Sequence, residues 1–309
     1  MRVSEATSHF DLAVLGADDP LGEAVLRLLE EREVAIGKLY PLTLNEVEST
    51  VPFAGKDWPC MTEAEFDFNQ AQALVVASRA AAARSLAIQA LAARPAMPVV
   101  GVAGIEPAPA VAVARVLRVI DALAGIQGAE AFVALPVAMA GKAGVDELSS
   151  QTRGLFNLDS PDPEVFPSQI AFNVMPLPDQ DYDTTLSEAT ERLLGRAVEV
   201  GFSSVLAPMF FGAGAMLHVR GERNVELDKL RQALTRADGI TLMESDLPAG
   251  IPTPATDAAD SDDVFIGRIQ ATGNHLKLWL VFDPFRLEAA RIVAAVENWI
   301  DKPTNSMLT

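Results

Sequence analysis

The sequence predicts an α/β protein with a doubly wound parallel sheet in its first third and an α+β domain with a mixed sheet in the remainder. In the first third, short apolar segments alternate with segments of helical spacing, an order typical of a parallel sheet covered by helices. Residues 97–117 join the two parts: a β-branched run leads through Gly101 and Gly104 into an alanine-rich helix with Pro107 and Pro109 at its start. Beyond it, strands are many and crossovers few, which favours a mixed sheet with helices on one face.

The elements expected before residue 104 follow from runs of apolar residues and from helical spacing. The apolar run 10–15 ends at Gly16 and predicts a buried strand, and apolar residues then recur on one helical face. In order we expect strand 10–15, helix 21–32, strand 34–42, a hairpin at 51–60 turned at Gly55-Lys56, strand 73–77, helix 79–93 and strand 99–103.

The second part is read in the same way, with proline-rich and acidic stretches taken as surface loops. The segment 169–175, QIAFNVM, alternates and predicts a strand. In order we expect helix 111–123, strand 131–137, helix 143–156, loop 157–167, strand 169–175, helix 186–200, strands 203–210 and 215–220, helix 227–237, loop 246–263, a hairpin of 264–270 and 276–282 turned near Gly273-Asn274, and helix 285–299.

The amino-acid composition argues against several classes of binding partner. The chain has 309 residues, which favours about two domains, and 50% of them are hydrophobic, enough for a large core. A formal charge of −18 argues against nucleic acid and anionic membranes. One cysteine excludes a disulfide framework, and the three histidines lie too far apart in sequence to predict a metal site. With neither a signal pattern nor a membrane-length apolar run, we expect a cytoplasmic protein.

The first strand-turn-helix is where a dinucleotide-binding fold would hold a pyrophosphate. Gly16 and Gly22 occupy the first and last positions of a G-x-x-G-x-x-G turn, but Asp19 occupies the middle one. A carboxylate about 4 Å from a phosphate costs roughly 1 to 4 kcal/mol, so Asp19 weakens any cofactor site here. The alternative role for Asp18 or Asp19 is to cap the following helix.

The junction at residues 97–117 lies where such sheets place their chemistry, at the carboxyl end of a strand. Between Gly101 and Arg115 there is no Ser, Thr, Cys, Lys or His, and the one reactive group is Glu106. A pairing of Glu106 with Asp146 or Glu147 has no spacing argument behind it, and acidic side chains are usually solvated.

Several segments of the second part resemble aspartate-semialdehyde dehydrogenases. Residues 140–152 resemble that family's AGK…(D/E)EL…QT stretch, 166–176 its FPxQIAFNVxP segment, 262–269 its D-D-V-x-V-G-R-I strand, and 279–286 its WVVxDNLRKG segment. The resemblance runs in order over nearly the whole chain, from Phe10 to Trp299.

The resemblance implies a Rossmann-like NAD(P)-binding-type domain at 1–108, completed by the C-terminal helix 285–302, and an inserted dimerisation domain at 109–284. It implies the NADP-dependent interconversion of aspartyl phosphate and aspartate semialdehyde through a cysteine thioester. It also implies a homodimer, and it leaves open a heterodimer with an active relative.

The family's reactive residues are replaced in this chain. The nucleophilic cysteine of an N-P-N-C pattern falls at or beside Pro107, and the glutamine before AGK falls near Leu135. The arginine and histidine of R-V-P-x-x-x-G-H fall at Leu206 and Ala213. The asparagine placed against the nicotinamide falls at Pro284, although Asp283 and Arg286 match.

Two further residues, His218 and Cys60, are candidates to replace the family's histidine and cysteine. His218 comes five residues after the family's histidine position, in an alternating strand, and a surface or hydrogen-bonded core histidine is the favoured role. Cys60 lies in the predicted hairpin with no neighbouring His or Lys to lower its pKa, which favours an incidental thiol. The cluster that discriminates the cofactor would fall at residues 40–45, where no basic residue could hold a 2′-phosphate.

These replacements predict a non-catalytic member of the family with a structural or regulatory role as a dimer. Gly16 and Gly22 are then the remnant of a site for NADP or NAD that Asp19 weakens. The first alternative is an NAD(P)-binding oxidoreductase with altered chemistry. The second is an active semialdehyde dehydrogenase with Cys60 as a relocated nucleophile. No metal site is expected.

Overall fold

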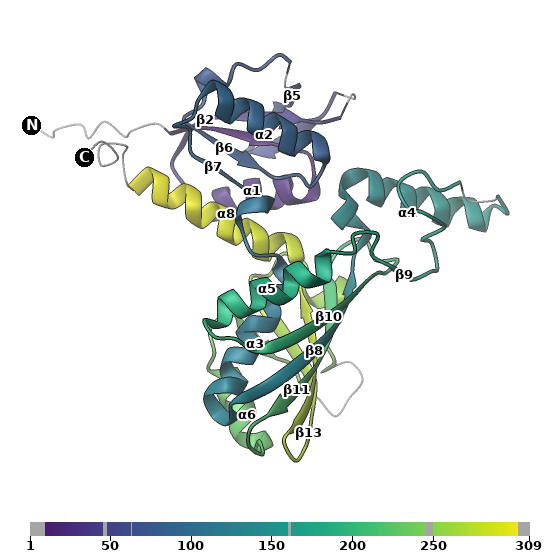
Figure 1. The fold of residues 1–309 in the computed structure, drawn as a ribbon. Helices are drawn as coiled ribbons and strands as arrows, with labels where there is room; N and C mark the ends of the chain where they lie inside the picture. The colour runs from purple at the N-terminus through teal and green to yellow at the C-terminus, as the bar shows by residue number, and fades with distance from the viewer. Residues whose placement is uncertain (1–9, 46–47, 63, 160–161, 245–249, 302–309) are drawn as a thin grey trace, which may run out of the picture. The chain divides into compact units, whose positions relative to one another are not determined.

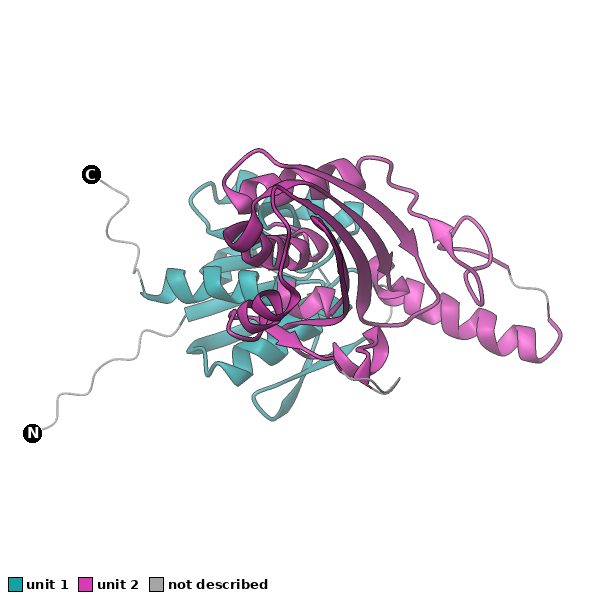
Figure 2. Cartoon of the chain, turned by 90° about the horizontal axis from the view of Figure 1, so that it is seen from below, with its two compact units in different colours: residues 1–105, 288–309 teal, residues 106–287 magenta. Residues whose placement is uncertain are grey.

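The computed structural model describes residues 10–45, 48–62, 64–159, 162–244 and 250–301. The chain divides into two units (Figure 2): unit 1 holds residues up to Ile105 together with those from Glu288 onward, and unit 2 holds Glu106–Leu287. No helix in the described part of the chain is long and apolar enough to cross a membrane.

Unit 1 is built on a parallel sheet with strand order β5-β2-β1-β6-β7 (Figure 1). Since the chain moves to one side of β1 and later to the other, the sheet is doubly wound, as predicted. Its elements are β1 Phe10–Leu15, α1 Pro20–Glu31, β2 Ile36–Thr43, β3 Thr50–Phe53, β4 Lys56–Pro59, β5 Met61–Thr62, β6 Ala73–Val76, α2 Ala81–Ala93 and β7 Val99–Gly101.

The predicted hairpin is confirmed as the antiparallel pair β3 and β4, although its turn comes one residue earlier. Ala54 and Gly55 both have positive φ, 52° and 70°, which is the geometry of a tight turn between twisted strands. The predicted strand 99–103 is shorter than expected, because a 3₁₀ turn at Val102–Gly104 follows β7 directly.

Unit 2 contains a mixed sheet with strand order β12-β13-β14-β11-β8-β10-β9. Pairs β8 with β10 and β12 with β13 are parallel and the others antiparallel, which confirms the predicted mixed sheet. Its elements are α3 Ala108–Ala124, β8 Ile126–Leu135, α4 Gly141–Phe156, β9 Met175–Pro176, α5 Tyr182–Leu194, β10 Glu199–Leu206, β11 Ala213–Gly221, α6 Leu227–Thr235, β12 Ile240–Leu242, α7 Pro254–Asp257, β13 Val264–Thr272, β14 His275–Phe282 and the start of α8 Pro284–Asp301.

Helices α3, α5 and α6 cover one face of this sheet (Figure 1). Their buried residues, such as Val116, Leu186 and Leu230, share one core cluster with inward-facing strand residues such as Leu217 and Leu278. The other face carries exposed side chains, so the strands alternate between buried and exposed positions.

Two predicted elements are wrong. The segment 169–175 is not a strand: only Met175–Pro176 pairs with the sheet, and Phe172 has a φ of 57°, which extended backbone does not allow. The helix predicted at 186–200 ends at Leu194, because Gly195 adopts the left-handed conformation that terminates helices, and Glu199 begins β10. The loop predicted at 246–263 includes α7, and residues 245–249 lie outside the described part.

Gly22 has a steric role that can be tested. A Cβ atom on Gly22 would lie 2.0 Å from the carbonyl oxygen of Gly16, which is backbone and cannot turn away, whereas a Cβ on Gly104 would meet nothing within 4 Å. We expect Gly22→Ala to lower the free energy of unfolding by about 1–3 kcal/mol, the usual cost of overpacking, despite the better helix propensity of alanine. Urea unfolding of both alanine variants measures this, and equal stability of the two would contradict it.

Candidate functional site

The carboxyl end of the sheet in unit 2 brings together three of the positions where the resemblance puts reactive residues. Leu135 ends β8 and pairs in register with Leu206, which ends β10, while Ala213 begins β11. Leu135, Leu206 and Ala213 are 0%, 5% and 0% exposed and belong to one apolar core cluster. This end of the sheet is therefore filled by apolar side chains.

The segments that leave the strands close over this end. The Ala207 amide donates to the Leu135 carbonyl at 2.9 Å, and the Val137 amide donates to the Met209 carbonyl at 2.9 Å. A Cβ atom on Gly212, whose φ is +75°, would lie 2.2 Å from the Pro254 carbonyl oxygen. The backbone is thus tightly packed where β10 turns toward β11.

Pro107 stands immediately before α3, at its N-cap position, and is partly exposed. It has no side-chain donor or nucleophile, and Ala108 beside it joins the same apolar core cluster as Leu135. None of the side chains at these four positions can attack a carbonyl, accept a proton or bind a carboxylate.

In contrast to the apolar end of the sheet, the segment that follows β14 contains charged residues. The Asp283 carboxylate accepts hydrogen bonds from the backbone amides of Phe285 at 2.9 Å and Arg286 at 3.1 Å, which caps α8, and from the Asp260 amide at 3.0 Å. The Arg286 Nε donates to Asp262 at 2.6 Å. Asp283 and Arg286 therefore both bind the loop before β13, a structural role that their match to the family did not reveal.

Burial raises the pKa of Asp283, although its three backbone donors act in the opposite direction and lower it. The charge on Asp260 adds to the increase. No arrangement of three or more metal-ligating side chains occurs among the described residues.

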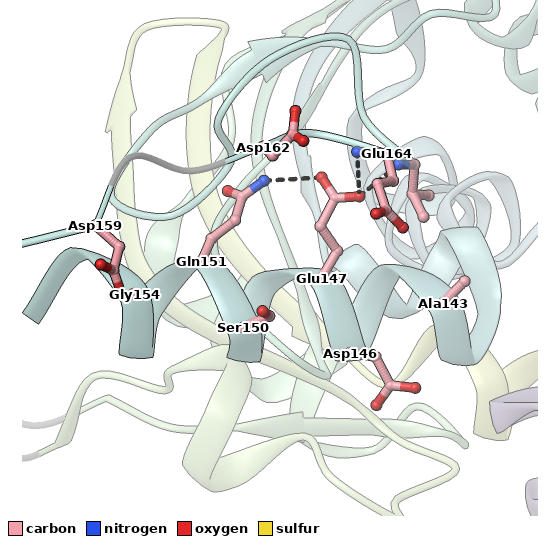
Figure 3. A pocket seen from close by; sticks show the side chains of 10 residues that line it. Ala143, Asp146, Glu147, Ser150, Gln151, Gly154, Asp159, Asp162 and Glu164 are labelled. Carbon is pink, nitrogen blue, oxygen red and sulfur yellow. Dashed lines mark hydrogen bonds between the residues drawn. The ribbon is translucent and has the colours of Figure 1, made fainter. Parts of the chain in front are cut away.

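The segments 140–152 and 166–176 of the resemblance meet at α4, and Figure 3 shows Glu147 and Gln151 on that helix. The Gln151 carbonyl oxygen accepts from the Ile170 amide at 2.9 Å and the Ala171 amide at 3.1 Å, and its amide donates to Glu147 at 2.8 Å. Glu147 also accepts from the backbone amides of Glu164, at 3.0 Å, and Val165. These contacts hold 164–171 in its irregular conformation, which explains why it is not a strand.

A pocket of about 580 Å³ lies over α4 (Figure 3). Its acidic lining residues are Asp146, Glu147, Asp159, Asp162 and Glu164. Glu147 is buried and bound to backbone amides, so it serves the loop rather than a pairing with Glu106.

In unit 1, the turn between β1 and α1 has the shape of a dinucleotide turn with few free donors. Gly16 has a φ of +76°, and Gly22 packs against it too closely for any side chain. The amides of Gly16 and Ala17 both donate to the Leu42 carbonyl, and the Asp19 amide donates to Gly16. Pro20 has no amide hydrogen, so most of the donors that would face a phosphate are used or missing.

The two aspartates of this turn differ in role. Asp19 occupies the N-cap position of α1, but its side chain makes no capping hydrogen bond. The Oδ2 atom of Asp18 accepts from Thr43 Oγ1 at 2.8 Å, Asn45 Nδ2 at 2.9 Å and Ser49 Oγ at 2.8 Å. Asp18 thus binds the segment after β2 and does not cap α1, whereas Asp19 stands at the predicted cap position without a side-chain capping hydrogen bond.

The site does not fit NADP, the cofactor that the resemblance implies. A 2′-phosphate needs cationic donors at the end of β2, and residues 40–45 contain none. Asp18 and Asp19 add negative charge at the same end of the sheet.

Two further candidates are Cys60 in unit 1 and His218 in unit 2. Cys60 is half-buried, and burial raises the pKa of its thiol, an effect that the charge of Asp18 increases and a hydrogen bond with Ser49 opposes. A thiol with a raised pKa is a poor nucleophile at neutral pH. His218 is exposed on the uncovered sheet face, between Glu130 and Lys277 in register, which confirms a surface histidine.

Comparison with known proteins agrees with this architecture. The family model described as semialdehyde dehydrogenase, dimerisation domain, matches residues 118–286. The chain belongs to the aspartate-semialdehyde dehydrogenase family.

Three relatives illustrate the range of the family. Aspartate-semialdehyde dehydrogenase of Legionella pneumophila is 27% identical, over 91% of this chain and 93% of its own. A USG-1 protein homolog of Azotobacter vinelandii is 30% identical, over 91% of this chain and 94% of its own. The structure of a probable aspartate-semialdehyde dehydrogenase from Pseudomonas aeruginosa is 25% identical, with a TM-score of 0.79, and the match covers 95% of this chain and 99% of that one.

The raised pKa of Asp283 predicts a pH-dependent stability. A carboxyl whose pKa is higher in the folded than in the unfolded chain favours folding when protonated, so its contribution is lost as pH rises through the folded-state pKa. We expect the melting temperature of the wild type, relative to that of Asp283→Asn, to fall as the pH rises above about 4, the ordinary pKa of an aspartate. Thermal unfolding of both proteins across this range tests it, and a difference that is constant or rises with pH would contradict the assignment.

Proposed function

We propose that this chain is a non-catalytic member of the aspartate-semialdehyde dehydrogenase family that acts as a homodimer in a structural or regulatory role. The observation that carries the proposal is the apolar filling of the sheet end in unit 2 by Leu135, Leu206 and Ala213, together with Pro107 at the start of α3. These four residues stand where the resemblance expects a glutamine, an arginine, a histidine and a cysteine.

Energetic arguments also count against catalysis at the carboxyl end of the unit 2 sheet. Acyl transfer through a thioester needs a nucleophile, a base and donors for developing negative charge. Loss of a general base alone typically costs about 10² to 10⁴ in rate, and here nucleophile, base and substrate clamp are replaced together. A carboxylate substrate placed against buried Leu206 would lose its hydration without gaining a partner.

The two units have different proposed roles. Unit 1 is a Rossmann-like, NAD(P)-binding-type domain, and unit 2 is the dimerisation domain. A cytoplasmic location accords with the family's metabolic reaction. Regulation would be exerted by pairing with itself or with an active relative.

The uncovered face of the unit 2 sheet is the surface we assign to the second copy of this chain. Across neighbouring strands, Phe132 lies opposite Ser203 and Met216, and Met216 lies opposite Trp279, so these side chains form one row on the same face. Phe132 is 51% exposed. Phe132, Met216 and Trp279 make the row largely apolar, and the next row on the same face consists of Glu130, His218 and Lys277. An apolar core beside a polar rim is typical of an interface, and the whole row lies within the dimerisation-domain match.

An altered oxidoreductase is the second candidate. It is favoured by the glycine geometry at Gly16 and Gly22, which keeps the shape of a dinucleotide turn. It also requires a group able to transfer or receive a proton, and the residues at the four family positions, Pro107, Leu135, Leu206 and Ala213, supply none.

The first proposal predicts the absence of the family reaction. With aspartate semialdehyde, phosphate and NADP, we expect NADPH formation at least about 10⁴-fold slower than by the Legionella pneumophila relative assayed in parallel. Absorbance at the NADPH band measures it. A rate within about a hundredfold of that relative would overturn the proposal, and its loss in Cys60→Ala would establish Cys60 as a relocated nucleophile.

The second prediction concerns the dimer. Light scattering of the wild type is expected to give twice the chain mass of 32.9 kDa at micromolar concentration. Phe132→Glu places a charge in the apolar row and is expected to give monomers, because an unpaired buried charge costs several kcal/mol. The matched control is Ile88→Glu on α2, where an exposed apolar residue lies outside unit 2. A monomeric wild type, or equal effects of the two variants, would refute the assigned surface.

A further inference from the structure

The uncovered face of the unit 2 sheet carries two rows of charged or titratable side chains beside the apolar row of Phe132. Their members are exposed and lie in register on neighbouring strands: Glu130, His218 and Lys277 in the first row, and Glu199, Arg220 and His275 in the second. Within these rows the carboxylates lie on β10 and β8, whereas the basic residues and histidines lie on β11 and β14. The two signs of charge therefore occupy opposite halves of one face.

The charges of the two rows are available to another molecule. In the part of the chain that the structure describes, the two carboxylates, the guanidinium and the ammonium of these rows form no hydrogen bond or ion pair. Elsewhere in unit 2, by contrast, Arg196 pairs with Asp121 at 2.6 Å. All six side chains line one pocket of about 390 Å³, so a partner that covers this face meets them together.

The first row has its carboxylate at one end and its ammonium at the other. A Cβ atom on Gly201 would lie 2.1 Å from the Oε2 atom of Glu130, so the Glu130 carboxylate stands over the neighbouring strand β10. Lys277 lies on β14, and the strand order is β14-β11-β8-β10. The two charges are therefore placed symmetrically about the line between β8 and β11.

A second copy of this chain has the charges that this pattern fits. Facing sheets usually align their strands within about 30°, and a symmetric pair of facing sheets needs a twofold axis in the plane between them. An axis parallel to the strands, over the line between β8 and β11, places β10 of one copy over β14 of the other. The Glu130 carboxylate then faces Lys277 of the second copy, twice by symmetry, and Phe132 faces Met216.

The second charged row fits the same axis. Glu199 on β10 faces His275 on β14 of the second copy, and Arg220 on β11 faces Gly128 on β8, which has no side chain to obstruct it. Each position thus meets a residue of different charge or size, as a self-complementary interface requires.

An axis across the strands fits the charges poorly. It would place each strand over its own counterpart, so an axis between the two charged rows would bring the cations of β14 and β11 against each other. An axis through the apolar row would instead place the charged rows over the row of Ala134, Gly214 and Val281 on its other side, where charges would lose hydration without gaining partners.

We propose that the second copy covers this face with its strands aligned in the same direction, so that Glu130 of each copy forms an ion pair with Lys277 of the other. This inference rests on the proposed homodimer and specifies its axis and its ion pairs. A monomeric wild type would refute both proposals, whereas a dimer in which these two residues do not pair would refute only this one.

Single charge reversals test the pairing. Glu130→Lys and Lys277→Glu each set like charges opposite one another at both ends of the first row, so we expect dimer dissociation constants at least about tenfold above that of the wild type. Sedimentation or light scattering over a range of concentrations measures them. The matched controls Glu226→Lys and Lys229→Glu make the same changes in an exposed pair at α6, on the covered side of the sheet, and are expected to stay within about twofold of the wild type. Unchanged dissociation constants, or equal effects in the controls, would overturn the pairing.

Mixing the two variants separates pairing between copies from pairing within one chain. In a dimer of one Glu130→Lys chain with one Lys277→Glu chain, the introduced charges face each other at one end and the native Glu130 and Lys277 face each other at the other. We expect such mixed dimers to form with about the wild-type affinity, and an affinity tag on one variant distinguishes them by mass. The double variant Glu130→Lys/Lys277→Glu should likewise regain self-association. A mixture that associates no more tightly than either variant alone would contradict the proposal, even where the double variant recovers.

Discussion

Apolar packing at the carboxyl end of the unit 2 sheet is the constraint on which the rest of this structure depends. Leu135 and Leu206 are paired in register, so two parallel strands end together in a dry cluster. The chain leaving each strand bonds to the other through Ala207 and Val137. Once this end is closed, a charged or hydrated group there would have no partner, because the surrounding backbone polar groups are already bonded.

Buried carboxylates serve as anchors throughout the molecule. Asp18, Glu147 and Asp283 are each less than a tenth exposed, and each holds a segment that lies beside a strand or helix end. Among the hydrogen bonds described for these three carboxylates, the donors are backbone amides, hydroxyls and side-chain amides. The use of neutral donors is consistent with the sequence, in which 42 acidic residues outnumber 24 basic residues. For Asp283, the backbone donors lower the pKa of the carboxyl, but burial raises it by more.

The sequence predicts an element correctly where its local pattern of apolar residues matches the burial of that element in the fold. Residues 12–15 of β1 are all apolar because both faces of the strand are buried there, and the hairpin of β13 and β14 alternates because one face is open. The pattern failed at 169–175, where alternation arises without a sheet: Ile170 and Ala171 are buried against α4, and Gln151 supplies the hydrogen bonds that a neighbouring strand would. The charge pairs of 186–200 favour a helix over the whole segment, but Gly195 ends it.

The sequence by itself determined the fold class and the family, because these depend on residue identity and spacing. Only the tertiary structure decided what the remaining polar groups do. It brought Asp18 to donors 25, 27 and 31 residues away, and joined Glu147 to a loop 17 residues further on. Such contacts depend on strand pairing and on how loops cross strand ends. A carboxylate that is predicted locally as a helix cap can therefore satisfy its hydrogen bonds elsewhere, as Asp18 does.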